Sequence, residues 1–75
     1  MNRSEALAPL KTGEGRMPCT AGMAVRGQIR QVAVRMGVDY YEEKGWFEST
    51  FILRGPADRV IKLKRLLEQH FGDDE

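Results

Sequence analysis

The chain has little of what metal centres and disulfide-stabilised folds require. Its 75 residues include a single cysteine and a single histidine, Cys19 and His70. One cysteine cannot form an internal disulfide, and one of each residue is too few for a metal site built from cysteine and histidine ligands. A lone cysteine is typical of a reducing compartment, so the expected location is the cytoplasm and no bound metal is expected.

Long apolar segments are also lacking. The longest apolar runs are three residues, as in Phe51-Ile52-Leu53, which is far short of the roughly 20 apolar residues that span a bilayer. The first residues lack the basic start and apolar stretch of a secretory signal. We therefore expect no membrane association.

Catalytic motifs are scarce as well. Glu42 and Glu43 are adjacent, so on a strand they point to opposite faces and cannot act together as an acid and a base. The segment Gly13-Glu14-Gly15-Arg16 lacks both the preceding strand and the following Gly-Lys-Ser/Thr of a phosphate-binding loop. The expected protein is not an enzyme, with no cofactor and no small-molecule ligand.

Charge is nearly balanced overall but unevenly distributed. The net charge of +1 combines +3 over residues 21–37, −2 over residues 38–54 and +2 over residues 55–71. Segments with helical spacing are therefore basic, and the segment between them is acidic.

The clearest pattern begins with a β-hairpin after Gly37. Lys44-Gly45 separates two runs of β-forming residues, and glycine accepts the positive φ of a tight turn. A two-residue turn places Val38 opposite Phe51 and Tyr41 opposite Glu48. Alternation then gives a core face and a polar, aromatic face. The core face carries Val38, Tyr40, Glu42, Phe47, Ser49, Phe51 and Leu53; the other carries Asp39, Tyr41, Glu43, Trp46, Glu48, Thr50 and Ile52.

Two helices flank this hairpin. Gly55-Pro56 ends the second strand and starts a helix with Asp58 in its first turn, and Gly72 is the predicted stop. The apolar arc of this helix contains Val60, Leu63, Leu66, Leu67, His70 and Phe71; we expect His70 to fill space or to contact the last carbonyls. The earlier helix begins near Ala24, ends at a Gly37 cap and has an arc of Val25, Ile29, Val32, Ala33 and Met36.

This earlier helix has a competing interpretation. Gly27 costs a helix about 1 kcal/mol relative to alanine, and Val34 points away from the apolar arc. A strand through Val32, Val34, Met36 and Val38 would place these four residues on one face. The helical spacing is the better match.

The predicted fold is α+β, with a two-layer arrangement of two helices on an antiparallel hairpin. A two-stranded hairpin alone is marginal in water, so a third strand is expected from residues 16–23 or from a second copy of the chain. The order (β)αββα is that of a partial ferredoxin-like arrangement. Residues 1–20 are predicted to be mostly disordered, residues 21–72 to form one domain, and residues 73–75 to form an acidic tail.

The aromatic face of the hairpin suggests a binding function. Tyr41, Trp46 and Ile52 stand among acidic residues, and tryptophan and tyrosine are common interface anchors. We expect a small non-catalytic module that makes protein–protein contacts, often as a homodimer.

The alternative is a nucleic-acid-binding accessory protein with a basic two-helix surface. That surface would consist of Arg26, Arg30, Lys62 and Arg65, which could track phosphates. The near-neutral net charge and the placement of the aromatic residues on the acidic face argue against it.

Overall fold

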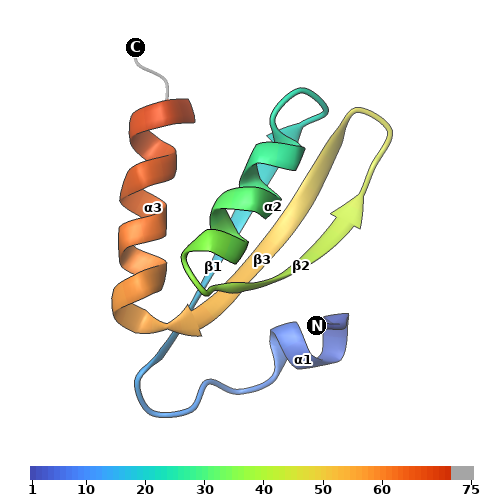
Figure 1. Ribbon diagram of the computed structural model, residues 1–75. Coiled ribbons are helices and arrows are strands. Elements are labelled where there is room, and N and C mark those ends of the chain that lie inside the picture. Colours follow the sequence, from blue (N-terminus) through green and yellow to red (C-terminus); the bar gives the residue numbers. More distant parts are fainter. Residues whose placement is uncertain (72–75) are drawn as a thin grey trace.

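The computed structural model describes residues 1–71 and confirms an α+β fold. A short N-terminal helix precedes the order β-α-β-β-α (Figure 1). The elements are α1 (Arg3–Leu7), β1 (Glu14–Gly22), α2 (Arg26–Arg35), β2 (Asp39–Lys44), β3 (Glu48–Pro56) and α3 (Ala57–Phe71).

The three strands form an antiparallel sheet in the order β1-β3-β2. Ile52 of β3 is opposite Pro18 on one side and opposite Tyr41 on the other. The third strand predicted within residues 16–23 is therefore present as β1. Residues 1–20, which we expected to be mostly disordered, instead contain α1 and most of β1, and the expected domain boundary at residue 20 lies inside a paired strand.

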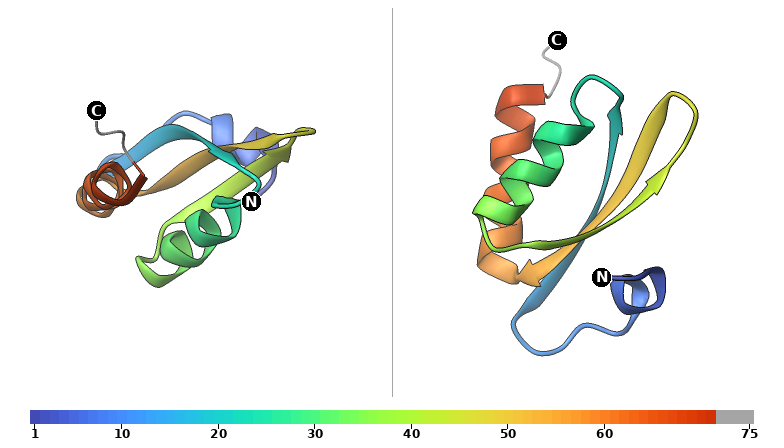
Figure 2. Two further views of the ribbon diagram at one scale, coloured as in Figure 1. Left: turned by 90° about the horizontal axis from the view of Figure 1, so that it is seen from above. Right: turned by 45° about the vertical axis from the view of Figure 1, so that its right-hand side comes forward.

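Both long helices lie on one face of the sheet (Figure 2). Their apolar arcs pack on the inward residues of β2 and β3, as the alternation predicted. The buried core comprises Ala21, Ile29, Ala33, Val38, Phe51, Leu53, Val60, Leu63 and Leu67. The competing strand interpretation of residues 32–38 is wrong, because most of these residues lie in or cap α2 and Val34 is 68% exposed.

The last turn of α3 bears on the two roles expected of His70. His70 is exposed, so it does not fill space in the core, and contact with the last carbonyls stays a prediction. Leu66, one turn earlier, is half-buried and Leu67 is buried. The predicted stop at Gly72 and the acidic tail 73–75 lie outside the described residues.

The hairpin register differs from the predicted one by four residues. The loop is Gly45-Trp46-Phe47 rather than Lys44-Gly45, and Tyr41 pairs with Ile52 rather than Glu48. A shift by an even number of residues leaves each paired side chain on its predicted face, so alternation alone cannot distinguish the two registers. Trp46 and Phe47 are exceptions, because the longer loop removes both from their predicted strand faces and leaves Phe47 82% exposed.

The second face of the sheet is covered at one end by α1 (Figure 2). Arg54 reaches from β3 to this segment, and its guanidinium donates to the carbonyl oxygens of Glu5, Ala8 and Pro9 at 2.6 to 2.9 Å. It also pairs with the Glu14 carboxylate at 2.9 Å. Arg54 is 8% exposed, so its charge is buried but fully engaged.

Gly37 ends α2 as the sequence predicted. Its φ of +69° lies in the left-handed region, where glycine carries no Cβ penalty. The N–H of Gly37 donates to the carbonyl of Val34, and the N–H of Val38 donates to that of Ala33. This pair of bonds is the Schellman motif, and it turns the chain directly into β2.

Two glycine substitutions, one within α2 and one just after its end, should therefore have opposite effects. Gly37→Ala should lower the free energy of unfolding by about 1–2 kcal/mol, because alanine is strained at positive φ. Gly27→Ala should raise it by about 0.5–1 kcal/mol, because a Cβ there meets nothing within 4 Å and alanine favours the helix. Urea unfolding of both variants measures this; a Gly37→Ala chain as stable as the wild type would contradict the assigned cap.

Candidate functional site

Two of the three predicted interface residues meet on the open face of the sheet. We use open face for the side of the sheet opposite α2 and α3, which α1 covers at one end. Tyr41 and Ile52 are direct cross-strand partners there and both are half-buried. The neighbouring Thr20, Thr50 and Pro18 are exposed. This part of the prediction places the residues correctly.

Trp46 does not join them. It lies in the loop between β2 and β3 and is 91% exposed, while Glu48 and Thr50 separate it from Ile52 along β3. The sequence placed Trp46 on a strand because a two-residue turn was assumed. The three-residue loop releases it from the face of Tyr41 and Ile52.

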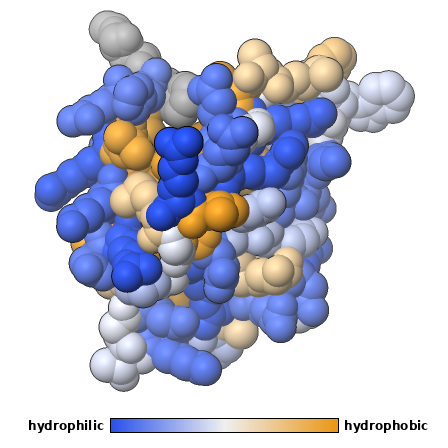
Figure 3. All heavy atoms as spheres, in the orientation of Figure 1, coloured by the Kyte–Doolittle hydropathy of each residue, from blue (hydrophilic) through white to orange (hydrophobic). Residues whose placement is uncertain are grey.

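Exposed apolar side chains instead lie at the end of the molecule that carries the hairpin loop. Phe47 is 82% exposed and Met23 is 60% exposed. Gly22 and Glu48 are the last pair of β1 and β3, so the residues that follow and precede them, Met23 and Phe47, leave the sheet at the same place. We call Met23, Trp46 and Phe47 the aromatic tip. The space-filling view has hydrophobic atoms at this end (Figure 3).

The base of the hairpin loop is closed by a hydrogen bond. The N–H of Gly45 donates to the carbonyl of Glu48 at 2.7 Å. This bond closes the loop directly above the last pair of β2 and β3, Lys44 and Ser49. The aromatic tip is thus presented by a closed turn on a paired ladder rather than by a long loop.

Acidic side chains line the open face. Asp39 and Glu43 of β2 and Glu48 of β3 are all exposed on it. Among the residues that the structure describes, no group of three or more histidine, cysteine or acidic side chains is placed to hold a metal ion. The three carboxylates therefore contribute negative charge to this face.

The predicted basic surface is partly used inside the molecule. Arg30 Nε pairs with Glu42 Oε1 at 2.8 Å, and Arg26 donates to the Ser49 hydroxyl at 3.4 Å. Lys62 and Arg65 are exposed on α3. The structure thus does not present the four residues as one free basic layer, because both arginines of α2 turn toward the sheet.

Glu42 and Ser49 form the centre of a polar cluster under α2. The fully buried Ser49 hydroxyl donates to Glu42 Oε2 at 2.7 Å, while Arg30 donates to the other oxygen. Burial raises the pKa of Glu42, but the hydrogen bonds from Ser49 and Arg30 together outweigh burial, so its pKa lies below the ordinary value. The carboxylate is thereby held ionised between α2 and β2.

The single cysteine lies in a small apolar pocket. Cys19 lines a cavity of about 450 Å³ between β1 and the two helices, together with Ile29 and Leu67. Burial raises the pKa of the Cys19 thiol, so the thiolate is disfavoured. This environment is that of a packed thiol rather than an activated nucleophile.

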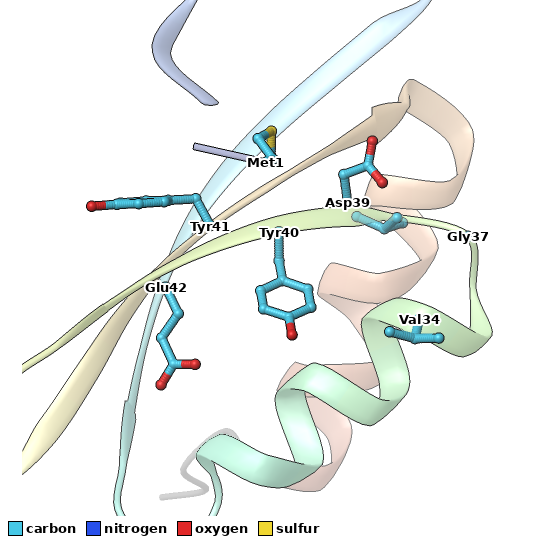
Figure 4. Close-up of a pocket in the computed structure, with 8 residues that line it drawn as sticks. Met1, Val34, Gly37, Asp39, Tyr40, Tyr41 and Glu42 are labelled. Carbon is cyan, nitrogen blue, oxygen red and sulfur yellow. The ribbon is translucent and has the colours of Figure 1, made fainter. Parts of the chain in front are cut away.

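A groove borders the outer edge of β2. Its volume is about 660 Å³, and its lining residues are Met1, Val34, Gly37, Val38, Asp39, Tyr40, Tyr41 and Glu42. Figure 4 shows Tyr40 and Glu42 pointing toward α2, with Tyr41 and Asp39 on the opposite side of the strand. Sequence patterns did not reveal this groove, because the N-terminal residue Met1 forms one of its walls.

Comparisons of the chain with protein-family models, with curated proteins and with solved structures gave no match. Within residues 1–71, no helix is both long enough and apolar enough to cross a membrane. The features of the molecule that bear on function are the aromatic tip, the open face and the β2 groove.

The Glu42 cluster predicts a pH dependence of stability. The lowered pKa of Glu42 stabilises the fold at pH values above the ordinary glutamate pKa of about 4.3. That contribution is lost progressively as the pH falls through the lowered folded-state pKa. Glu42→Gln should reduce the free energy of unfolding by about 1 kcal/mol at pH 7 and by less at pH 3.

Glu43→Gln is the matched control for this experiment. Glu43 is the next residue, but it is exposed on the opposite face, so its substitution should change stability little at either pH. Chemical unfolding at pH 7 and pH 3 measures both variants. Equal losses for the two substitutions would contradict the role assigned to the cluster.

Proposed function

We propose that this protein is a small non-catalytic binding module whose aromatic tip makes protein–protein contacts. The observation that carries the proposal is the exposure of two adjacent large aromatic side chains, Trp46 at 91% and Phe47 at 82%. Large aromatic side chains contribute most of their binding energy when they are buried. Their display on a closed turn is typical of an anchor that becomes buried on association.

The scaffold of the module is a partial ferredoxin-like arrangement. The sheet order β1-β3-β2 and the placement of both long helices on one face support this assignment. In this arrangement the helices bury one face of the sheet, and the open face, the hairpin and the outer strand edges are left for contacts.

A second copy of the chain is the first partner to consider. The open face carries the exposed acids Asp39, Glu43 and Glu48, whereas the outer side of α3 carries the exposed bases Lys62 and Arg65. Complementary charges on two surfaces of one molecule favour association between copies. In such a dimer, the aromatic tip supplies the apolar contact and the charges orient the two chains.

The test is to remove the aromatic tip and to measure self-association. Trp46→Ala with Phe47→Ala should raise the dissociation constant for self-association at least tenfold, because anchor truncations typically cost more than about 1.4 kcal/mol. Stability should change little, since both side chains lie outside the core. Sedimentation over a range of concentrations, together with thermal unfolding, measures the two effects.

The matched control removes apolar side chains elsewhere. Leu7 and Leu10 are 50% and 42% exposed and lie in the N-terminal segment, away from the hairpin loop and from α3, so their double substitution by alanine should leave association unchanged. The proposal fails if the aromatic-tip variant associates as strongly as the wild type, or if the control variant loses association equally.

A further inference from the structure

We propose that the outer edge of β2 accepts an extended, basic segment of a partner protein as a fourth strand of the sheet. The inference rests on the proposed function, because it names the chemistry of a partner that a binding module would engage. It differs from that proposal in its surface: the contact is the backbone edge and groove of β2 rather than the aromatic tip.

Within residues 1–71, the outer edge of β2 has unpaired backbone groups. The N–H of Gly45 bonds across the hairpin to Glu48, so residues two and four positions earlier, Glu43 and Tyr41, also face β3. The alternate residues Tyr40, Glu42 and Lys44 then direct their N–H and C=O groups to the outer edge. An edge of this kind is the template for strand addition.

The opposite edge of the sheet is protected. Pro18 lies in the middle of β1 opposite Ile52, and proline in a paired strand turns its nitrogen to the outer edge. A strand added along β1 would meet a position without a donor at the centre of its ladder. The free edge suited to strand addition is therefore β2.

A groove beside β2 leaves space for an added strand. The groove of about 660 Å³ follows this edge and has walls on both sides of the strand, Val34 of α2 on one and Met1 on the other. Val34 is 68% exposed, although it lies beside the half-buried Tyr40. Alternate side chains of an added strand would contact Val34 and Tyr40 on the helix side and Tyr41 on the open side (Figure 4).

The open side of β2 is acidic. Asp39 and Glu43 are exposed on the open side of β2, on either side of Tyr41. On the helix side, Glu42 is already neutralised by Arg30. An added strand that matches this pattern carries lysine or arginine at two positions four residues apart, with apolar residues facing Val34 and Tyr40.

The same charges disfavour a second copy at this edge. If two β2 strands paired antiparallel about Tyr41, Asp39 of one copy would face Glu43 of the other. Like charges directly opposite each other destabilise a sheet, which favours a basic segment of another protein as the occupant.

The experiment uses a probe peptide that carries this pattern. The acetylated and amidated peptide Thr-Lys-Val-Thr-Val-Lys-Thr is titrated at low salt into the ¹⁵N-labelled full chain. We expect saturable shifts and slowed hydrogen exchange at the amides of Tyr40, Glu42 and Lys44. A peptide with glutamate in place of both lysines should not bind. Slowed exchange elsewhere alone, or equal binding of the acidic peptide, would overturn the inference.

Variants of the chain separate edge recognition from general charge attraction. Asp39→Asn with Glu43→Gln should weaken peptide binding about three- to tenfold. Glu48→Gln is the matched control, because Glu48 lies on the same face but on the central strand, and it should change binding less than twofold. Equal losses in the two proteins would contradict strand pairing at β2.

The outcome also separates this inference from the proposed function. The aromatic-tip variant should still bind the peptide, since its substitutions lie outside β2. If the peptide fails to bind while self-association still requires Trp46 and Phe47, the edge inference is wrong and the proposed function stands. Concentration-dependent protection of the β2 amides without peptide would place a second copy at this edge and would also overturn the inference.

Discussion

The pairing of β3 on both sides is the constraint on which the rest of the structure depends. One strand aligns nine residues with β1 and six with β2. It also directs Phe51 and Leu53, both fully buried, into the layer of helices. Because side chains alternate, the same alignment directs Ile52 and Arg54 to the opposite side. The core, the attachment of α1 and the open face are thus consequences of one register.

Arg54 gives the N-terminal segment its place on the sheet. A helix of five residues such as α1 has little stability of its own. Arg54 and Arg16 donate hydrogen bonds to the carbonyls at its end. Ala6, within α1, is fully buried. As a result, Met1 lies beside β2, so a buried charge on the central strand determines the shape of a groove on an edge strand.

Much of the fold could be predicted from periodicity. The arcs of α2 and α3, the Gly37 cap and the two faces of the hairpin followed from spacing, because burial of one face leaves a regular pattern in the sequence. The elements within residues 1–20 were harder to predict. Their strand contains Pro18 and two glycines and is paired, among the described strands, with β3 alone. A capping box of Asn2 and Glu5 marks the start of α1, but a helix of five residues depends on Arg54 for its place on the sheet.

The candidate site was less accessible to sequence reasoning. Tyr41 and Ile52 were correctly placed on one face, since alternation determines faces. Trp46 was misplaced, because alternation does not determine the length of a turn, and Phe47 was assigned to the core for the same reason. The β2 groove could not be foreseen from local spacing, because it brings Met1 together with α2 and β2, which are distant from it in the sequence.

Pro18 has a further consequence for how assemblies of this protein can grow. A sheet with two receptive edges can add neighbours without limit, as filaments do. Pro18 has no backbone N–H to donate, so the β1 edge is blocked and only the β2 edge is left for a further strand. If β2 accepts a strand as proposed, each molecule is extended on a single side, and extension then stops. In this way a single proline in the middle of β1 would favour discrete complexes over polymers.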